Sequence, residues 1–100
     1  MYVVIFTAEI ADLNREYFNL AAKLRQRAID NYGCAEFIST TQDNQEIALS
    51  YWPDLTSIQR WKADELHIRG QELGKSQFYK GYRVDICEVV RHYQGASQEP

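Results

Sequence analysis

The sequence has little of what marks several large protein classes. Only two of its 100 residues are cysteine, too few for a disulfide scaffold, so a reduced, cytoplasmic protein is expected. No apolar run approaches the ~20 residues that cross a bilayer. Eleven basic residues against 14 acidic ones give a net charge of −3, which disfavours a nucleic-acid binder because phosphate neutralisation needs clustered Lys and Arg. Neither a nucleic-acid partner nor a membrane is expected.

Signatures for secretion, cofactors and metals are also missing. The opening apolar residues have no basic leader and meet Glu9 early, so no secretory signal is expected. Neither G-x-G-x-x-G nor G-x-x-x-x-G-K occurs. His67 and His92 are far apart in sequence. Cys34 and Cys87 lack a short zinc-ligand spacing, so both are interpreted as buried thiols. No cofactor and no metal are expected.

What the chain does contain is apolar and aromatic surface. Hydrophobic residues make up 45% of it and aromatic residues 13%, which is typical of an ordered domain. At 11.7 kDa it is one domain, expected over residues 2–93, with a frayed polar tail over residues 94–100. A domain of this size buries only about 65% of its unfolded surface, so apolar excess must be covered elsewhere.

The patterns along the chain predict the order β-α-β-β-α-β. Residues 1–10 read as a strand, and a helical stripe then runs from Arg15 to a stop at Gly33, with Asp12 or Asn14 as its cap. The further elements are a hairpin of residues 34–41 and 46–52 around a turn at 42–45, a helix from Asp54 or Thr56 to Gly74 with a break near residues 63–64, a connector at 75–81, and a strand at 82–93. This order predicts a ferredoxin-like α+β fold, a four-stranded antiparallel sheet with helices on one face.

The first and the last strand of the sequence are apolar on both faces. In the first strand Val4 and Phe6 alternate with Val3 and Ile5, so neither face is purely polar. The last strand shows the same mixture. A bare apolar sheet face is unusual on a monomer, and the simplest cover is a second copy. A homodimer through the sheet faces is therefore expected.

The richest candidate site lies around Trp61 and His67. An indole offers a large flat wall and one N–H donor, and a neutral imidazole is a base. On an unbroken helix the two residues would point 120° apart, whereas a break near Ala63 lets both reach one cavity between helix and sheet. The alternative is that Trp61 is a core residue at helical spacing from Ile58 and that His67 is structural.

Five further residues are candidates for substrate binding. Arg83 lies among apolar neighbours in the last strand and would hold an anionic or phenolate oxygen, or else form a salt bridge. The other four candidates are aromatic: Tyr51, Trp52, Phe78 and Tyr82. They are expected to form the walls around a small hydrophobic or aromatic molecule, or else to belong to the core.

In order and spacing the chain resembles the antibiotic biosynthesis monooxygenase (ABM) domain proteins, which are dimeric α+β barrels. The resemblance spans about residues 2–93 and rests on segments 2–6, 49–52, 58–62, 65–67, 78–84 and 88–93. It implies a cofactor-independent monooxygenase that oxidises a phenolic or anthrone-type ring with O₂, after the substrate has lost a proton. Trp61 matches the family's helix tryptophan. Ser57 stands nearest to the family's asparagine, and His67 stands near a family tyrosine.

Other functions fit the same resemblance. One alternative is a non-catalytic small-ligand-binding or stress-associated dimer with the same pocket. The third is the haem-degrading or isomerase-like branch of the superfamily. The haem-degrading branch needs an asparagine on the first strand, where residues 1–10 have none, and Gln71 is nearer than His67 to its haem-ligand position.

Overall fold

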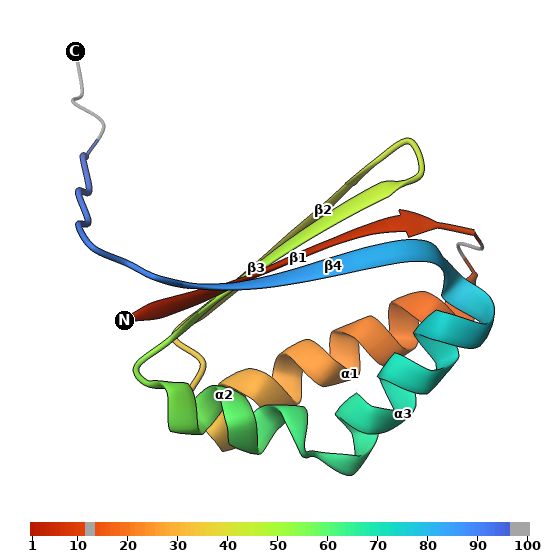
Figure 1. Cartoon of the computed structure of the whole chain (residues 1–100), viewed down its shortest axis with the longest axis horizontal. Coiled ribbons are helices and arrows are strands. Elements are labelled where there is room, and N and C mark those ends of the chain that lie inside the picture. The colour runs from red at the N-terminus through yellow and green to blue at the C-terminus, as the bar shows by residue number, and fades with distance from the viewer. Residues whose placement is uncertain (12–13, 97–100) are drawn as a thin grey trace.

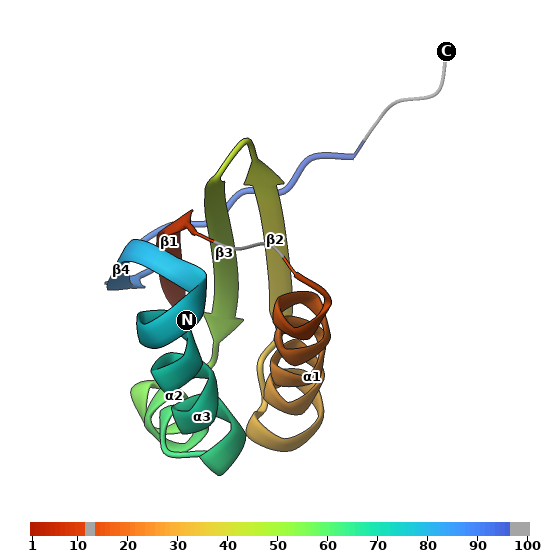
Figure 2. The same ribbon diagram turned by 90° about the vertical axis from the view of Figure 1, so that its right-hand side faces the viewer.

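The computed structural model describes residues 1–11 and 14–96. One four-stranded antiparallel sheet has the strand order β2-β3-β1-β4, and the helices lie together on one of its faces (Figures 1 and 2). In chain order the elements are β1 (Tyr2–Ile10), α1 (Arg15–Tyr32), β2 (Glu36–Gln42), β3 (Gln45–Trp52), α2 (Leu55–Lys62), α3 (Glu65–Leu73), a π-helix η1 (Gly74–Phe78) and β4 (Tyr79–Glu88). The predicted ferredoxin-like α+β fold is confirmed.

Local side chains fix where each helix begins. The side chains of Asn14, Asp54 and Asp64 accept hydrogen bonds from backbone N–H groups in the first turns of α1, α2 and α3. Of the caps expected from the sequence, Thr56 lies inside α2, and Asp12 lies outside the described residues. Gly33, at φ +76°, ends α1 in the left-handed conformation that glycine adopts without a steric penalty.

The hairpin is tighter than the sequence pattern predicts. β2 and β3 pair from Glu36 opposite Tyr51 to Gln42 opposite Gln45, which leaves only Asp43 and Asn44 in the turn. Asp43 has φ +55°, a conformation that Asp tolerates in two-residue hairpin turns. The strand bounds of 34–41 and 46–52 therefore shift by one or two residues.

The last strand differs from its prediction at both ends. It begins at Tyr79, within the expected connector, and ends at Glu88 rather than at residue 93. β4 pairs only with β1, and Tyr2 at the start of β1 already lies opposite Glu88. One further backbone bond, from the Val89 N–H to the Met1 carbonyl, completes the pairing at 2.9 Å. Beyond it, residues 89–96 extend away from the sheet (Figure 1).

The core consists of two separate clusters under the sheet. The first centres on Trp52, Trp61 and Ile58 at one end, and the second consists of Ile10, Tyr17 and Phe78 at the other. Alternation along the strands directs one set of side chains toward the helices and leaves the opposite set on the outer face. That outer face carries exposed apolar side chains, among them Ile38 at 47% and Ile47 at 38%.

Candidate functional site

A cavity of about 730 Å³ lies between the sheet and the helices α1 and α3. Its floor is the helix-facing side of the strands, and Leu20 and Leu24 from α1 lie opposite Gly70 from α3 on its walls. Residues of both core clusters border it, so the cavity occupies the space that divides the core. An apolar cavity of this size with a few polar groups is typical of a small-molecule site.

Trp61 and His67 meet at one end of the cavity. Their ring centroids lie 4.2 Å apart at an interplanar angle of 66°, and both residues line the cavity. Trp61 lies in the last turn of α2 and also packs on Trp52 at 5.0 Å between centroids. The helix break predicted near residues 63–64 is confirmed and brings both rings to one place.

Asp64 holds this break in position. Its buried carboxylate accepts hydrogen bonds from the Arg27 guanidinium at 2.5 Å and from the Tyr32 hydroxyl at 2.6 Å, both on α1. It also accepts the Leu66 backbone N–H at 2.8 Å as the cap of α3. The bond from Arg27 is the largest cause that holds the pKa of Asp64 well below its usual range. Asp64 therefore fixes the start of α3, and with it the direction of His67.

Burial sets the protonation of His67. Its imidazole is largely shielded from water, which lowers its pKa below the ordinary value of 6.5. Asp64 opposes this shift and Lys62 adds to it. His67 is thus neutral at pH 7, the state in which one ring nitrogen accepts a hydrogen bond or a proton.

The other end of the cavity carries a buried carboxyl group, Glu46 on β3. Glu46 is only 8% exposed, and burial raises its pKa to about 6. Tyr79 lies near enough for Glu46 to add to the rise in its pKa, which burial mainly causes. Tyr17 from α1 packs edge-on against Tyr79 at 6.0 Å between ring centroids. This end is therefore a carboxylate beside aromatic rings.

A close backbone approach fixes the Tyr79 ring. A Cβ atom on Gly74 would lie 2.6 Å from Tyr79 Cε2, which is nearer than real contacts allow. Only glycine therefore lets the ring lie against η1. Phe6 packs on the same ring at 5.4 Å between centroids.

The cavity has unpartnered polar atoms at both ends. Among the described residues, four buried side-chain polar atoms make no hydrogen bond within the protein, and all four belong to residues that line this cavity: Tyr17 Oη, Glu46 Oε2, Trp61 Nε1 and His67 Nδ1. Buried polar groups are nearly always hydrogen-bonded, because desolvation without a partner costs about 1–3 kcal/mol. Their gathering in one cavity makes it the candidate ligand site.

The structure places three of the other predicted residues at or beside the cavity. Phe78 and Tyr82 line it. Trp52 is fully buried beneath Trp61, and its indole N–H donates to Ser50 Oγ at 2.8 Å, so Trp52 supports the cavity wall from the core.

Tyr51 and Arg83 are placed differently. Tyr51 is not among the cavity-lining residues and lies on the outer face of the sheet, opposite Val3 and Glu36. Arg83 borders the cavity, but its guanidinium is largely exposed and pairs with Asp85 at 3.0 Å. The salt-bridge alternative for Arg83 is therefore the one the structure contains. Strand alternation directs Val84, not Arg83, toward the helices.

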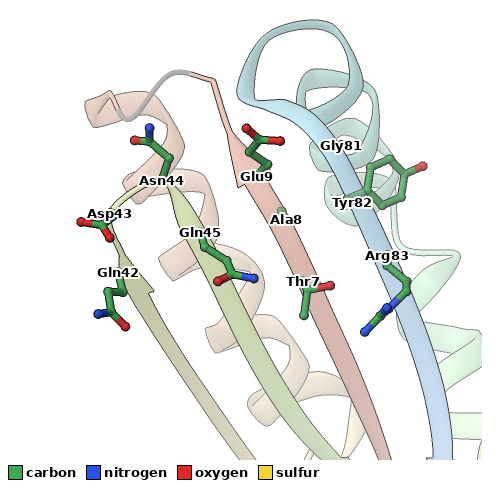
Figure 3. A pocket seen from close by; sticks show the side chains of 10 residues that line it. All are labelled: Thr7, Ala8, Glu9, Gln42, Asp43, Asn44, Gln45, Gly81, Tyr82 and Arg83. Atoms are coloured by element: carbon green, nitrogen blue, oxygen red, sulfur yellow. The ribbon is translucent and has the colours of Figure 1, made fainter.

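A second hollow of about 580 Å³ lies at the hairpin end of the sheet. In Figure 3 the side chains of Thr7, Glu9, Gln45 and Arg83 extend from the sheet face opposite the helices. It is bordered mainly by exposed polar groups and contains none of the unpartnered buried atoms.

Among residues 1–11 and 14–96, no group of three His, Cys, Asp or Glu side chains is placed to hold a metal ion. In the same residues no helix is long and apolar enough to cross a membrane.

Sequence reasoning missed Glu46 and Tyr17. Glu46 begins a strand beside a polar turn, where an exposed carboxylate is the ordinary expectation. The available signal was the alternation of β3: Glu46 shares a face with Ala48, Ser50 and Trp52, and this is the buried face. Tyr17 lies on the apolar stripe of α1, where the sequence pattern predicts a core residue.

Comparison with known proteins supports the fold. No family model matches the chain. The chain is 29% identical over 91 residues to an uncharacterized protein, YqjZ, of Bacillus subtilis, a match that covers 90% of this chain and 80% of that protein.

Three solved structures share the architecture. SnoaB, a cofactor-independent oxygenase from Streptomyces nogalater, superposes with a TM-score of 0.76 at 10% identity, over 91% of this chain and 94% of SnoaB. Rv0793 from Mycobacterium tuberculosis gives 0.78 at 7% identity, over 93% and 98%. A structure named antibiotic biosynthesis monooxygenase gives 0.65 at 16% identity, over 91% and 100%. The resemblance to ABM proteins expected from the sequence is thus confirmed for the fold.

Proposed function

We propose that this protein is a cofactor-independent monooxygenase that binds a small phenolic molecule in the cavity and oxidises it with O₂. The observation that carries the proposal is that two unpartnered atoms, Trp61 Nε1 and His67 Nδ1, belong to rings whose centroids lie 4.2 Å apart. A phenolic hydroxyl within hydrogen-bond reach of both atoms would accept the indole N–H and donate its O–H to the imidazole. The shared fold with SnoaB, a cofactor-independent oxygenase, supports the same activity.

The two side chains have complementary roles at this oxygen. His67, neutral because burial lowers its pKa, takes the phenolic proton at Nδ1. Trp61 donates its N–H to the phenolate oxygen as negative charge develops there. Because both groups are fixed before the substrate binds, little reorganisation is needed during the reaction.

The chemistry balances with O₂ as the only oxidant. The phenolate delocalises its charge to the ring carbons ortho and para to the oxygen, and one of these carbons that carries a hydrogen forms a bond to one atom of O₂. The proton held by His67 passes to the distal oxygen and gives a hydroperoxide. Loss of the carbon's hydrogen as a proton breaks the O–O bond, leaves a carbonyl and releases the second oxygen as water. Phenol and O₂ thus yield quinone and water.

Oxygen uptake tests this function. Purified protein is incubated with phenols, quinols and anthrones in air, without added cofactor, and O₂ consumption and products are measured. We expect His67→Ala to lower turnover by about 100-fold or more, since general bases contribute at least that much. His92→Ala makes the same substitution at an exposed histidine and should leave the rate unchanged. Full turnover in His67→Ala would reject the assigned role.

A ligand carrier is the second candidate, favoured by the apolar walls that separate the two polar ends. It predicts that a phenol stays bound and unchanged in air. Native mass spectrometry of the protein with each phenol separates the two functions: retention of intact ligand without O₂ uptake indicates a carrier, and release of oxidised product indicates the enzyme.

We further propose that two copies associate through the outer sheet faces. Ile38 and Ile47 are exposed there and lie near Val3, Ile5 and Leu49 of the neighbouring strands. Sedimentation at micromolar concentration should give about twice 11.7 kDa. Ile47→Lys should shift the protein to a monomer, and a wild-type monomer would contradict the proposal.

A reducing, cytoplasmic setting agrees with both functions. Both cysteines are free thiols, and Cys34 is buried as expected. The expectation of burial is wrong for Cys87, which is exposed because it lies on the edge strand β4. Mass measurement of protein extracted under alkylating conditions should find both thiols reduced.

A further inference from the structure

The far end of the cavity also has a defined chemistry. Glu46 Oε2 is unpartnered and buried, and the unpartnered Tyr17 hydroxyl lies within the neighbouring core cluster. Rings of Phe6, Tyr79 and Tyr82 pack against one another beside them, with centroids 5.4–6.3 Å apart. These groups are not used by the reaction at Trp61 and His67.

The register of the sheet separates the two ends. Ser50 and Glu46 both face the cavity, opposite Val4 and Ala8 of β1. Val4 packs in the cluster that contains Trp61, so Ser50 lies near that end and Glu46 lies four residues further along β3. At about 3.4 Å per residue this step is about 14 Å. The two ends of the cavity are thus separated along β3 by enough room for a fused-ring molecule between them.

An ionised carboxylate accepts hydrogen bonds but donates none. With its pKa near 6, Glu46 is mostly ionised at pH 7.5. A ligand oxygen that can only accept would therefore leave the carboxylate buried without a partner, whereas a hydroxyl donates to it. The discrimination is large in such sites, because the buried polar group is left unpaired by the wrong ligand.

We propose that Glu46 selects substrates with a second hydroxyl, a hydrogen-bond donor at the end of the ring system opposite the oxygen held by Trp61 and His67. The substrate class is thus a flat, fused-ring diphenol with hydroxyls at both ends. This inference rests on the proposed function for the identity of the first end, and Glu46 is its specificity-determining residue.

Three naphthalene probes isolate this interaction. 2,6-Dihydroxynaphthalene carries hydroxyls at both ends, 6-methoxy-2-naphthol replaces one by an acceptor, and 2-naphthol lacks it. Binding is measured anaerobically at pH 7.5 by calorimetry, so that no turnover is required. We expect the diphenol to bind at least about 10-fold more tightly than either other probe, in line with about 1.5–3 kcal/mol for a hydrogen bond to a charged group.

Glu46→Leu removes the carboxylate and fills its volume with an apolar side chain, so it leaves no unpaired group. We expect the preference for the diphenol to disappear in this variant while 2-naphthol still binds. Glu72→Leu makes the same substitution at an exposed position on α3 that does not line the cavity, and it should keep the preference. Far-ultraviolet circular dichroism checks that each variant is folded.

The outcomes separate this inference from the proposed function. Equal affinities in the wild type, a preference that survives in Glu46→Leu, or no binding of any probe would overturn the role of Glu46. Loss of 2-naphthol binding in Trp61→Phe would still support the first end of the site. Oxygen uptake without a diphenol preference would keep the enzyme and reject the selectivity.

Discussion

The ring centroids of Trp61 and His67 lie 4.2 Å apart across a helix break. Trp61 lies in the last turn of α2, and His67 lies in the first turn of α3. Asp64 lies between them and fixes the break through two side chains of α1. The site therefore depends on a contact between the helices as well as on the two rings.

Replacement of Asp64 should weaken both the fold and the site. Asp64→Ala removes the cap of α3 and leaves Arg27 and Tyr32 without their shared acceptor, so we expect the free energy of unfolding to fall by about 2 kcal/mol. Asp64→Asn keeps a capping oxygen and should lose about half as much. Urea denaturation measures both. A loss in Asp64→Ala no larger than in the exposed cap variant Asp54→Ala would contradict the tethering role.

The pH profile of turnover should report His67. Burial lowers its pKa, so the neutral base persists below pH 6.5, the midpoint expected for an unperturbed imidazole. We expect the midpoint of the acid limb of kcat/KM to lie below pH 6.5. The mutation Lys62→Gln removes a nearby positive charge and should move the midpoint upward. A midpoint at or above 6.5 would show that His67 is not the group that takes the proton.

Glu46 should make stability fall as pH rises. Its pKa is about 6 in the folded protein and 4.5 ordinarily, so between these values the unfolded chain releases the proton first. The free energy of unfolding is then higher below pH 4.5 and lower above pH 6, by about 2 kcal/mol. Glu46→Gln should remove this change, and Glu72→Gln should not. Unfolding in urea at several pH values provides the comparison.

Gly74 should be required for the position of Tyr79. In Gly74→Ala the new Cβ displaces the Tyr79 ring toward the cavity, and we expect a loss of about 1 kcal/mol and weaker binding of naphthols. Gly81→Ala is the matched control, because a Cβ there meets nothing within 4 Å. Equal binding by the two variants would mean that Tyr79 does not border the bound ligand.

Much of the fold follows from the sequence because its signals are local. Alternation predicts the strands, the caps at Asn14 and Asp54 mark helix starts, and Gly33 marks a helix end. The end of β4 could not be predicted in this way. It is set by where β1 begins, since Glu88 pairs with Tyr2, and that register is a long-range property.

The candidate site was predictable at one end only. The pairing of Trp61 with His67 needed the helix break, for which Asp64 gave a local signal. Glu46 begins a strand beside a polar turn and resembles a surface residue in sequence, although the alternation of β3 places it on the buried face. Its aromatic surroundings, such as Tyr79, depend on the packing of other elements and could not be predicted. Likewise, Tyr51 and Arg83 fall on the outer face because strand alternation places them there, whatever their chemistry.

The indole N–H resonances measure the central claim most directly. The chain has two tryptophans, and Trp52 already donates to Ser50, whereas Trp61 Nε1 is unpartnered. In ¹⁵N-labelled protein, anaerobic titration with 2,6-dihydroxynaphthalene should move the Trp61 resonance downfield and leave Trp52 nearly unchanged, with Trp61→Phe identifying the two signals. A Trp61 resonance that stays in place at saturation would contradict the account, because no oxygen would then be held between Trp61 and His67.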